Sequence, residues 1–323
     1  MVLKKTQPFT LKGRRVWIAG HRGFVGSALR RRLQSEGCEI ITVGREKLDL
    51  TQQEAVETWV SEVRPDVVVL AASKVGNIVD SQAHPAEFIY ETSIIQTNVL
   101  HAAWKAGVAR LLLTASSAIY GTVAHQPISE DALLSAPMAS ASQWYAVPKI
   151  AGIMMCQAYR KQYGCDFVAT VPNNLYGPGD DFSQETARVI AALIDRAHNA
   201  KSSGKPSMDV WGTGKPFREF LYVDDFADAI VFILKYSDEP MINVGTGGEI
   251  TIRRLSETIM SIVGYTGKAT FLTEKPDGVP RMLLDSSRLR DMGWHARTGL
   301  EDGLRKTYEW YLENVAVKPA AVD

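Results

Sequence analysis

One stretch near the start of the chain restricts the folds open to it more than any other. Residues 16–19 are apolar, and Gly20, Gly23 and Gly26 follow in the spacing G-x-x-G-x-x-G before a helix-forming run over 27–37. A buried parallel strand, a glycine-rich turn and a helix in this order place backbone N–H groups and the positive end of a helix dipole against a pyrophosphate. The stretch therefore predicts the first unit of a dinucleotide-binding fold.

The three glycines have different roles in such a turn. Gly20 permits the tight turn, Gly23 lets the backbone approach the phosphates, and Gly26 lets the helix pack closely on the strand. Because three spaced glycines also occur in a plain structural turn, residues further along the chain must support the prediction. The cofactor-binding residues predicted in this turn are Gly20, Arg22, Gly23, Phe24, Val25 and Gly26.

Composition argues against several kinds of partner. The 323 residues are 46% hydrophobic, and 36 basic residues balance 36 acidic ones. This balance argues against nucleic acid or an anionic membrane as the main partner. The three cysteines are widely spaced and give neither a metal-binding pattern nor a disulfide framework. Since the first nine residues lack a signal core and no apolar run could span a bilayer, we expect a cytoplasmic protein without a membrane partner.

The end of the second predicted strand, over 39–43, bears on the choice of cofactor. An acidic residue there would hold the ribose 2′-hydroxyl of NAD. A glycine and Arg45 follow instead, and a guanidinium suits the 2′-phosphate of NADP through charge-assisted, forked hydrogen bonds. Arg22 could join Arg45, although both arginines could also be solvated surface residues. We predict NADPH as the cofactor, with Asp49 and Leu50 near its adenine.

Two further apolar strands are predicted over 66–72 and 110–115. Small residues end the first of them, so a flat cofactor can lie close to the backbone. Lys74 follows in a loop at the carboxyl edge of the sheet, where ligands bind in such folds. Ser116 and Ser117 end the second strand and are candidates to hydrogen-bond a reacting oxygen.

Tyr145 and Lys149 form the decisive pair. Their Y-x-x-x-K spacing, on a helix that continues to about 163, puts both side chains on one face. A tyrosine with an ordinary pKa near ~10 is a poor acid–base group at neutral pH unless an ammonium stabilises its phenolate, which Lys149 would do. Lys149 could also hold the nicotinamide ribose. Y-x-x-x-K alone is more often a solvated helix face, but with the glycine turn and the two serines it favours an active site.

Together with further motifs, these residues resemble the extended short-chain dehydrogenase/reductase family, and most closely its GDP-L-fucose synthase group. The resemblance covers about residues 14–314. The motifs that carry it are Ala19-Gly20-His21-Arg22-Gly23, Lys74-Val75-Gly76, Tyr145 with Lys149-Ile150-Ala151-Gly152, Asn174-Leu175-Tyr176-Gly177-Pro178, Arg218-Glu219-Phe220-Leu221 with Val223-Asp224-Asp225, Ile242-Asn243-Val244-Gly245-Thr246-Gly247, and Lys275-Pro276-Asp277-Gly278 with Pro280-Arg281.

The resemblance implies an NADPH-dependent reaction on a GDP-linked 4-keto-6-deoxy sugar. Tyr145 would give a proton to the sugar oxygen, Lys149 would assist it, and Ser116 or Ser117 would bind the carbonyl. Besides the glycine turn, the implied cofactor residues are Arg45, Asp49, Leu50, Leu70, Ala71, Ala72, Asn98, Tyr145, Lys149, Pro172, Asn174 and Leu175. The implied substrate residues are Lys74, Ser117, Ala118, Asn174, Arg188, Arg196, Trp211, Arg218, Asp277 and Arg281.

The chemistry of three of these side chains suits a nucleotide sugar. The indole of Trp211 could lie against the nucleotide, and the guanidinium groups of Arg196 and Arg218 could meet a diphosphate. The alternative for Trp211 is an ordinary core aromatic.

Two positions depart from the family. Its cysteine in the Ser-Ser-x-Ile-Tyr segment is Ala118 here, and its histidine after the Asn-Leu-Tyr-Gly-Pro segment is Arg188. The family uses that pair to invert C3 and C5, which needs one group to remove a carbon-bound proton and another to return one. A methyl group does neither, and a guanidinium is already protonated and cannot act as a base.

Other residues offer poor replacements for that pair. Cys156 and Cys165 are expected in the core, while His125 is a conceivable substitute in the loop after Tyr120. Met282, where the family tends to carry a lysine, suggests an altered sugar pocket.

Three functions remain open. The first is a 4-keto reductase of a GDP-4-keto-6-deoxy hexose or heptose that leaves C3 and C5 unchanged. The second is a bifunctional GDP-L-fucose synthase whose proton transfers use other groups. The third is a regulator that binds NADPH without turnover, which would have no need of the serine, tyrosine and lysine.

The predicted fold class is α/β, with a doubly wound parallel sheet and a smaller C-terminal α/β lobe. We expect a Rossmann domain that binds NADP over 12–174 and about 220–248. A lobe that binds the nucleotide sugar is expected over 175–219 and 249–316.

Two segments and two helices carry further expectations. Segments 220–223 and 241–244 are expected to return to the large domain. The resemblance implies a homodimer formed through the helices at about 86–106 and 145–163.

Overall fold

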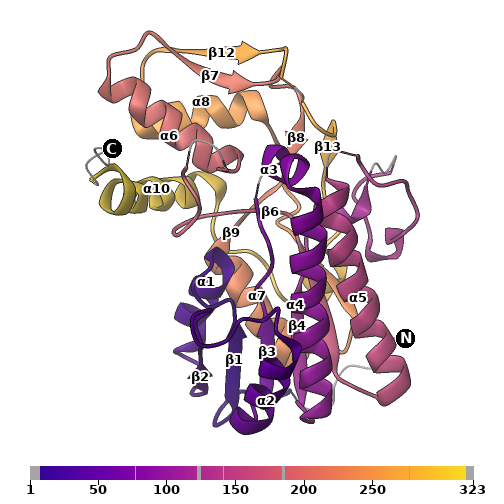
Figure 1. The fold of residues 1–323 in the computed structure, drawn as a ribbon. Helices are drawn as coiled ribbons and strands as arrows, with labels where there is room; N and C mark the ends of the chain where they lie inside the picture. Colours follow the sequence, from indigo (N-terminus) through magenta and orange to yellow (C-terminus); the bar gives the residue numbers. More distant parts are fainter. Residues whose placement is uncertain are drawn as a thin grey trace.

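The computed structural model describes residues 8–76, 78–121, 125–140, 142–183, 186–275 and 277–317. A six-stranded parallel sheet in the order β10-β5-β4-β3-β1-β2 lies at the centre of the larger part of the molecule (Figure 1). Its strands are β1 (Arg15–Ala19), β2 (Glu39–Ile41), β3 (Val67–Leu70), β4 (Arg110–Thr114), β5 (Phe167–Pro172) and β10 (Met241–Val244). The predicted α/β fold with a parallel sheet is confirmed.

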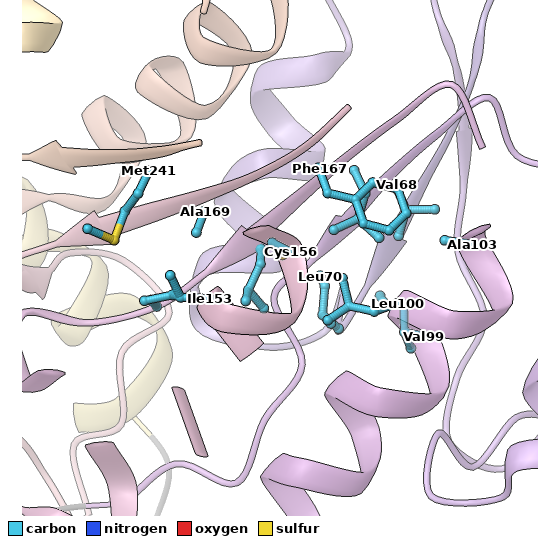
Figure 2. Close-up of a cluster of buried hydrophobic side chains, with 14 of the residues drawn as sticks. Val68, Leu70, Val99, Leu100, Ala103, Ile153, Cys156, Phe167, Ala169 and Met241 are labelled. Atoms are coloured by element: carbon cyan, nitrogen blue, oxygen red, sulfur yellow. The ribbon is translucent and has the colours of Figure 1, made fainter. Parts of the chain in front are cut away.

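Helices cover both faces of this sheet, which explains why its strands are apolar on both sides. In β3, Val67 and Val69 belong to the core under α1 and α7. Val68 and Leu70 belong to the opposite core, where Figure 2 shows them near Val99 and Cys156. The helices are α1 (Phe24–Leu33) and α7 (Val223–Tyr236) on one face, and α2 (Gln53–Val63), α4 (Pro85–Lys105) and α5 (Gln143–Tyr163) on the other.

A smaller lobe lies beyond the carboxyl edge of the sheet and has a core of its own (Figure 1). Its helices are α6 (Val189–Ser202), α8 (Ile252–Val263) and α10 (Leu300–Tyr311), the last followed by a π-helical turn over Leu312–Ala316. Its strands are β7 (Ser207–Trp211) beside β12 (Lys268–Leu272), and β8 (Phe217–Arg218) between β11 (Ile250–Thr251) and β13 (Arg281–Met282).

Short elements connect the two parts. They are α3 (Ile78–Ala83), α9 (Ser287–Asp291), the 3-10 helices η1 (Ser117–Tyr120) and η2 (Glu130–Ala132), and the strand pair β6 (Asn174–Tyr176) and β9 (Phe220–Tyr222).

Segments 220–223 and 241–244 meet the large domain in different ways. β9 pairs with β6 in a separate two-stranded sheet, while its Leu221 and the helix α7 that follows pack in the core of the large sheet. β10 joins the large sheet itself. The first helix begins at Phe24, three residues earlier than expected, and ends at Leu33. The division into domains stays a prediction.

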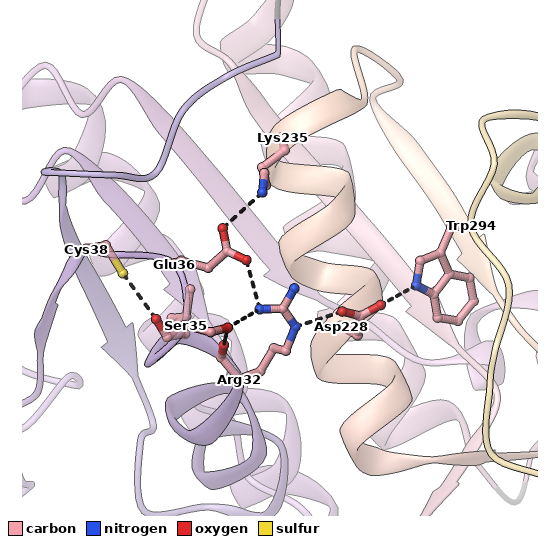
Figure 3. A network of polar contacts seen from close by, with 8 residues as sticks. Arg32, Ser35, Glu36, Cys38, Asp228, Lys235 and Trp294 are labelled. Atoms are coloured by element: carbon pink, nitrogen blue, oxygen red, sulfur yellow. Dashed lines mark hydrogen bonds and ion pairs between the residues drawn. The ribbon is translucent and has the colours of Figure 1, made fainter.

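A polar network joins α1 to α7 at the protein surface (Figure 3). Arg32 donates from Nε to Asp228 Oδ1 at 2.7 Å and from Nη1 to Glu36 at 2.8 Å. The other oxygen of Asp228 accepts the indole N–H of Trp294 at 3.0 Å, and Lys235 donates to Glu36 at 3.0 Å. Asp228, on α7, thus binds both α1, through Arg32, and the segment that contains Trp294.

No helix in the described part of the chain is long and apolar enough to cross a membrane.

Replacing Asp228 by alanine should lower the free energy of unfolding by about 1–3 kcal/mol, because the Arg32 guanidinium and the Trp294 indole both lose an acceptor. Urea denaturation measures this change. The matched control is Asp291→Ala, which removes an exposed carboxylate at the end of α9 and should change stability by less than about 0.5 kcal/mol. Equal effects of the two substitutions would contradict the prediction.

Candidate active site

A cavity of about 750 Å³ opens at the carboxyl edge of the six-stranded sheet. The predicted cofactor residues in its wall are Gly20, Arg22, Gly23, Phe24, Val25, Gly26, Arg45, Asp49, Leu50, Ala71, Ala72, Tyr145, Lys149, Pro172 and Leu175. Two predicted substrate residues, Lys74 and Arg188, line the same cavity. The structure therefore brings together most of the residues predicted for the cofactor and few of those predicted for the substrate.

The glycine turn has no room for side chains at two positions. Gly20 has a φ of +94°, and a Cβ there would lie 2.7 Å from the backbone nitrogen of Ala72. A Cβ on Gly26 would lie 2.1 Å from the carbonyl oxygen of Gly20. Gly23 is the N-cap of α1, so the free N–H groups at the start of that helix border the cavity. These contacts account for the glycine spacing.

An acid that sequence reasoning missed stands beside the predicted phosphate-binding arginines. Glu46 forms a two-pronged ion pair with Arg22, with both N–O distances 2.8 Å. Arg45 is more exposed and lies 3.7 Å from Asp49. The hydrogen bond from the Thr51 backbone N–H is the main cause that lowers the pKa of Asp49. Because Glu46 directly follows Arg45 in the sequence, an acidic partner for the predicted arginines could have been expected there.

Two predicted cofactor residues lie behind the cavity. Asn98 is buried in α4 and donates from Nδ2 to the backbone oxygen of Leu50 at 2.9 Å, so it supports the wall without lining it. Leu70 is buried at the end of β3 and also lies outside the wall.

Tyr145 and Lys149 come together on the first turns of α5, as their spacing predicts. Lys149 is buried, and its Nζ donates to the backbone oxygen of Thr114 at 3.1 Å and lies 6.0 Å from the centre of the Tyr145 ring. Burial lowers the pKa of Lys149 to about 8. Burial raises the pKa of Tyr145, while the charge of Arg188 and a hydrogen bond with Ser116 oppose that rise. The phenol is thus protonated at neutral pH.

The structure separates the two candidate serines. Ser116 lies beside the Tyr145 phenol and helps to lower its pKa, and the Ser116 Oγ caps η1 by accepting from the backbone N–H of Ala118. Ser117 is buried and donates to Asn173 Oδ1 at 3.2 Å. Ser116 is therefore the serine placed to share a reacting oxygen with Tyr145, and Ser117 supports the framework.

Asn173 leads from Ser117 to a buried carboxylate that sequence reasoning did not assign. Asn173 Nδ2 donates to Glu219 Oε2 at 2.6 Å, and the backbone N–H of Leu284 donates to the same oxygen at 3.1 Å. The backbone N–H of Gly247 donates to Glu219 Oε1 at 2.7 Å. Asn174, a predicted ligand residue, donates to the backbone oxygen of Glu219 at 2.9 Å and does not line the cavity.

Of the two positions that depart from the resembled family, Arg188 lines the cavity with Tyr145 and Lys149, whereas Ala118 does not line it. Ala118 is half-buried in η1, two residues after Ser116. Arg188 lines the cavity, donates to Asp180 at 2.5 Å and lies over the Phe24 ring, with its Cζ 4.7 Å from the ring centre.

The predicted nucleotide residues gather in the lobe, outside the wall of the cavity. The indole of Trp211 is 44% exposed, so it is not a core aromatic, and the guanidinium of Arg196 lies 5.0 Å from its ring centre. Lys275, for which the sequence predicts no role, lies 5.6 Å from the same ring. Arg218 donates to the backbone oxygen of Asp277 at 3.2 Å, and burial lowers its pKa.

The remaining predicted residue, Arg281, forms an ion pair with Glu249 at 2.7 Å. Beside it, the Gln126 side chain donates to the Arg281 backbone oxygen at 2.5 Å and accepts from the backbone N–H of Leu283 at 2.7 Å. These two bonds fix the backbone on either side of Met282, whose side chain is buried.

The candidate replacements for an acid–base pair lie away from the cavity. Cys156 is buried in the core, where burial raises the pKa of its thiol to about 12, and Cys165 is half-buried. His125 is exposed and does not line the cavity. His21 does line it, but it belongs to the glycine turn.

Comparison with known proteins identifies the family. A family model described as "NAD dependent epimerase/dehydratase family" matches residues 16–245. The chain belongs to this family. Within it, the chain is an extended short-chain dehydrogenase/reductase of the GDP-L-fucose synthase-like type.

Three relatives of this epimerase/dehydratase chain are informative. A GDP-L-fucose synthase from Sinorhizobium fredii is 49% identical over 309 residues, which cover 95% of this chain and 98% of that protein. A GDP-6-OMe-4-keto-L-xylo-heptose reductase from C. jejuni is 31% identical with a TM-score of 0.88, covering 95% and 99% of the two chains. A GDP-mannoheptose C4 reductase from Campylobacter jejuni, solved with NADP bound, is 31% identical with a TM-score of 0.84, covering 94% and 99%.

The cavity of this epimerase/dehydratase family member fits a dinucleotide. The positions where a Cβ would collide with backbone, Gly20 and Gly26, leave the turn open to phosphate oxygens, and α1 presents its first N–H groups there. Arg22 and Arg45 border the same cavity and can meet an additional phosphate. No cluster of histidine, cysteine and carboxylate side chains that could hold a metal ion occurs among the described residues.

Replacing Lys149 by methionine should change how stability depends on pH. Because the folded-state pKa of Lys149 is about 8 and its ordinary value is 10.5, the cost of burying its charge is fully present below pH 8 and is relieved as the pH rises through 10.5. The free energy of unfolding of the parent should therefore rise relative to Lys149→Met by about 3 kcal/mol between these limits. Chemical denaturation at several pH values measures both curves, and parallel curves would contradict the low pKa.

Proposed function

We propose that this chain is an NADPH-dependent 4-keto reductase of a GDP-4-keto-6-deoxy sugar, a hexose or a heptose, that leaves C3 and C5 unchanged. The observation that supports the proposal most is the set of side chains that line the cavity next to Tyr145 and Lys149. There Tyr145 and Lys149 are assembled for reduction, while the charged neighbour of Tyr145 is Arg188, which cannot remove a proton from carbon.

The chain is an oxidoreductase that acts on nucleotide sugars, and its cofactor is NADPH, which supplies the hydride when bound. Tyr145 gives its proton to the carbonyl oxygen, since burial keeps the phenol protonated until that moment. Ser116 donates a hydrogen bond to the same oxygen and orients the phenol. Lys149 stabilises the phenolate that remains and can reach the nicotinamide ribose. The glycine turn and Arg45 hold the phosphates.

The lobe supplies the features that suit a GDP-linked substrate. The exposed indole of Trp211, flanked by Arg196 and Lys275, offers a flat apolar face with two cations, which suits a base next to a diphosphate. Arg218 adds a third cation nearby in the fold. The names of the three relatives described above all include GDP, which supports this choice of nucleotide.

A bifunctional GDP-L-fucose synthase is the second candidate, because a relative of that name shares 49% of its residues with this chain. In that case other groups would move the protons at C3 and C5. The cavity wall offers the carboxylates of Asp80 and Glu91 for this role.

Two further expectations stay predictions. A homodimer would bury the outer face of α4 and α5, which exposes Tyr90, Val147 and Met154. A cytoplasmic location agrees with the three free cysteines.

The first experiment is incubation with GDP-4-keto-6-deoxy-mannose and NADPH in D₂O, with the product analysed by proton NMR. We expect a sugar reduced at C4 that keeps protium at C3 and C5 and its D configuration. Tyr145→Phe should lower turnover by about 100-fold or more, since the proton donor is lost. Deuterium at both positions in an L-configured product would show the bifunctional synthase instead. If nothing reacts, the corresponding heptose is the next substrate.

Restoring the family residues should restore exchange at carbon. The double variant Ala118→Cys, Arg188→His places a thiol and an imidazole where the parent has a methyl group and a guanidinium. We expect deuterium to enter C3 or C5 of the keto sugar in D₂O without NADPH, whereas the parent shows none. The single variant Ala118→Ser is the control, because a hydroxyl is too weak an acid for this exchange. Equal exchange in parent and double variant would contradict the assignment.

A further inference from the structure

Arg188 connects the segment before α6 to the cofactor side of the cavity. It directly precedes α6, and its Nη2 lies 2.5 Å from Asp180 Oδ1. Its guanidinium also lies over Phe24, the first residue of α1, and its side chain lines the cavity together with Tyr145. A single side chain thus contacts the glycine-turn helix and borders the reacting centre.

The position of this guanidinium is fixed by a buried acid. The side chain of Asp180 is only 2% exposed, whereas that of Arg188 is 37% exposed. A cation at the start of a helix is unfavourable because of the helix dipole, so Asp180 offsets the charge that Arg188 brings there. Since a guanidinium has five N–H donors, the bond to Asp180 leaves donors for the cavity.

From this arrangement we propose that Arg188 is a positioning residue for the reduction, which keeps a permanent positive charge beside Tyr145 while the tyrosine passes its proton to the substrate oxygen. The proposal rests on the reductase function proposed above. This role would explain why an arginine stands at position 188, where the resembled family has a histidine.

A second cation beside Tyr145 is useful because Lys149 does not keep its charge at every pH. Because burial lowers the pKa of Lys149 to about 8, its ammonium loses charge in mildly alkaline solution. A guanidinium stays charged throughout that range. The charge of Arg188 already lowers the pKa of Tyr145 against the effect of burial. Arg188 therefore continues to stabilise the phenolate when Lys149 has become neutral.

Other charged groups face the cavity from neighbouring elements. Lys74 lies in the loop after β3 and pairs with Glu87 at 3.0 Å and with Glu91 at 3.6 Å, and Asp80 of α3 also lines the wall. Both cations have acidic partners, Lys74 on α4 and Arg188 at Asp180, but of the two only Arg188 is among the groups that shift the pKa of Tyr145.

The charges balance in the step that Arg188 would assist. A hydride from NADPH bonds to the carbonyl carbon, and the π electron pair of the carbonyl forms the new O–H bond with the proton of Tyr145. The O–H bond of Tyr145 breaks and leaves its electron pair on the phenolate, beside Arg188 and Lys149. A proton from solvent then restores the phenol.

The test reads the titration of Tyr145 without substrate or cofactor. Phenolate absorbance is followed against pH in the parent and in Tyr145→Phe, and the difference isolates Tyr145. Arg188→Met should move this titration to higher pH by about 1–3 pH units. Arg188→Lys should move it less, because an ammonium keeps part of its charge near pH ~10 whereas a methionine has none. With substrate, Arg188→Met should lower kcat about tenfold or more, with the largest loss above pH 8.

Asp180→Asn is the matched variant of opposite sign. It keeps an oxygen for the Arg188 N–H but removes a negative charge, so the Tyr145 titration should move to lower pH. Shifts in the same direction for Arg188→Met and Asp180→Asn would indicate a structural disturbance and overturn the proposal. An unmoved titration, or a change in KM alone, would overturn it as well. If the titrations behave as expected but no 4-keto sugar nucleotide is reduced, the proposed function is wrong, while the effect of the Arg188 charge on Tyr145 still holds.

Discussion

The active site depends on one fully buried carboxylate, which accepts hydrogen bonds from backbone N–H groups and from an amide side chain. Glu219 accepts hydrogen bonds from Asn173 at the end of β5, from the backbone of Gly247 after β10, and from the backbone of Leu284 after β13. A buried charge is tolerated only when its oxygens are satisfied, and these donors come from three distant parts of the chain. Through Asn173 the same network reaches Ser117, so the lobe, the sheet edge and the catalytic segment are fixed together.

Burial gives the two catalytic side chains complementary properties. It favours the neutral form of each group, which keeps the proton on Tyr145 and makes Lys149 easier to deprotonate. Neither effect alone produces an acid that works at neutral pH. What completes the site is positive charge that is already present beside the phenol, from Lys149 on the same helix and from Arg188 on a different segment. A protein can change its reaction by exchanging such a neighbour while the tyrosine and lysine stay.

Local patterns predicted the fold, and they predicted that Tyr145 and Lys149 share one face of a helix. The apolar strands, the glycine turn and the one-turn spacing of Tyr145 and Lys149 depend on neighbours in the sequence, so they could be found without a structure. The pairing of β9 with β6 could not, because it joins strands more than 40 residues apart. Nor could the choice between Ser116 and Ser117, which depends on where η1 begins. Asn98 was assigned to the cofactor wall, but its amide turns away to Leu50.

The side-chain amide of Gln126 protects the protein against aggregation through an exposed strand edge. On one side β13 pairs with β8, and on the other its free backbone groups at Arg281 and Leu283 bond to this single side chain. Just beyond, Ile128 forms a bridge with Leu284. Unpaired strand edges recruit strands from other molecules and start aggregation. Here a side chain takes the place of a neighbouring strand, so the β13 edge of the three-stranded sheet is covered against such pairing without a further strand.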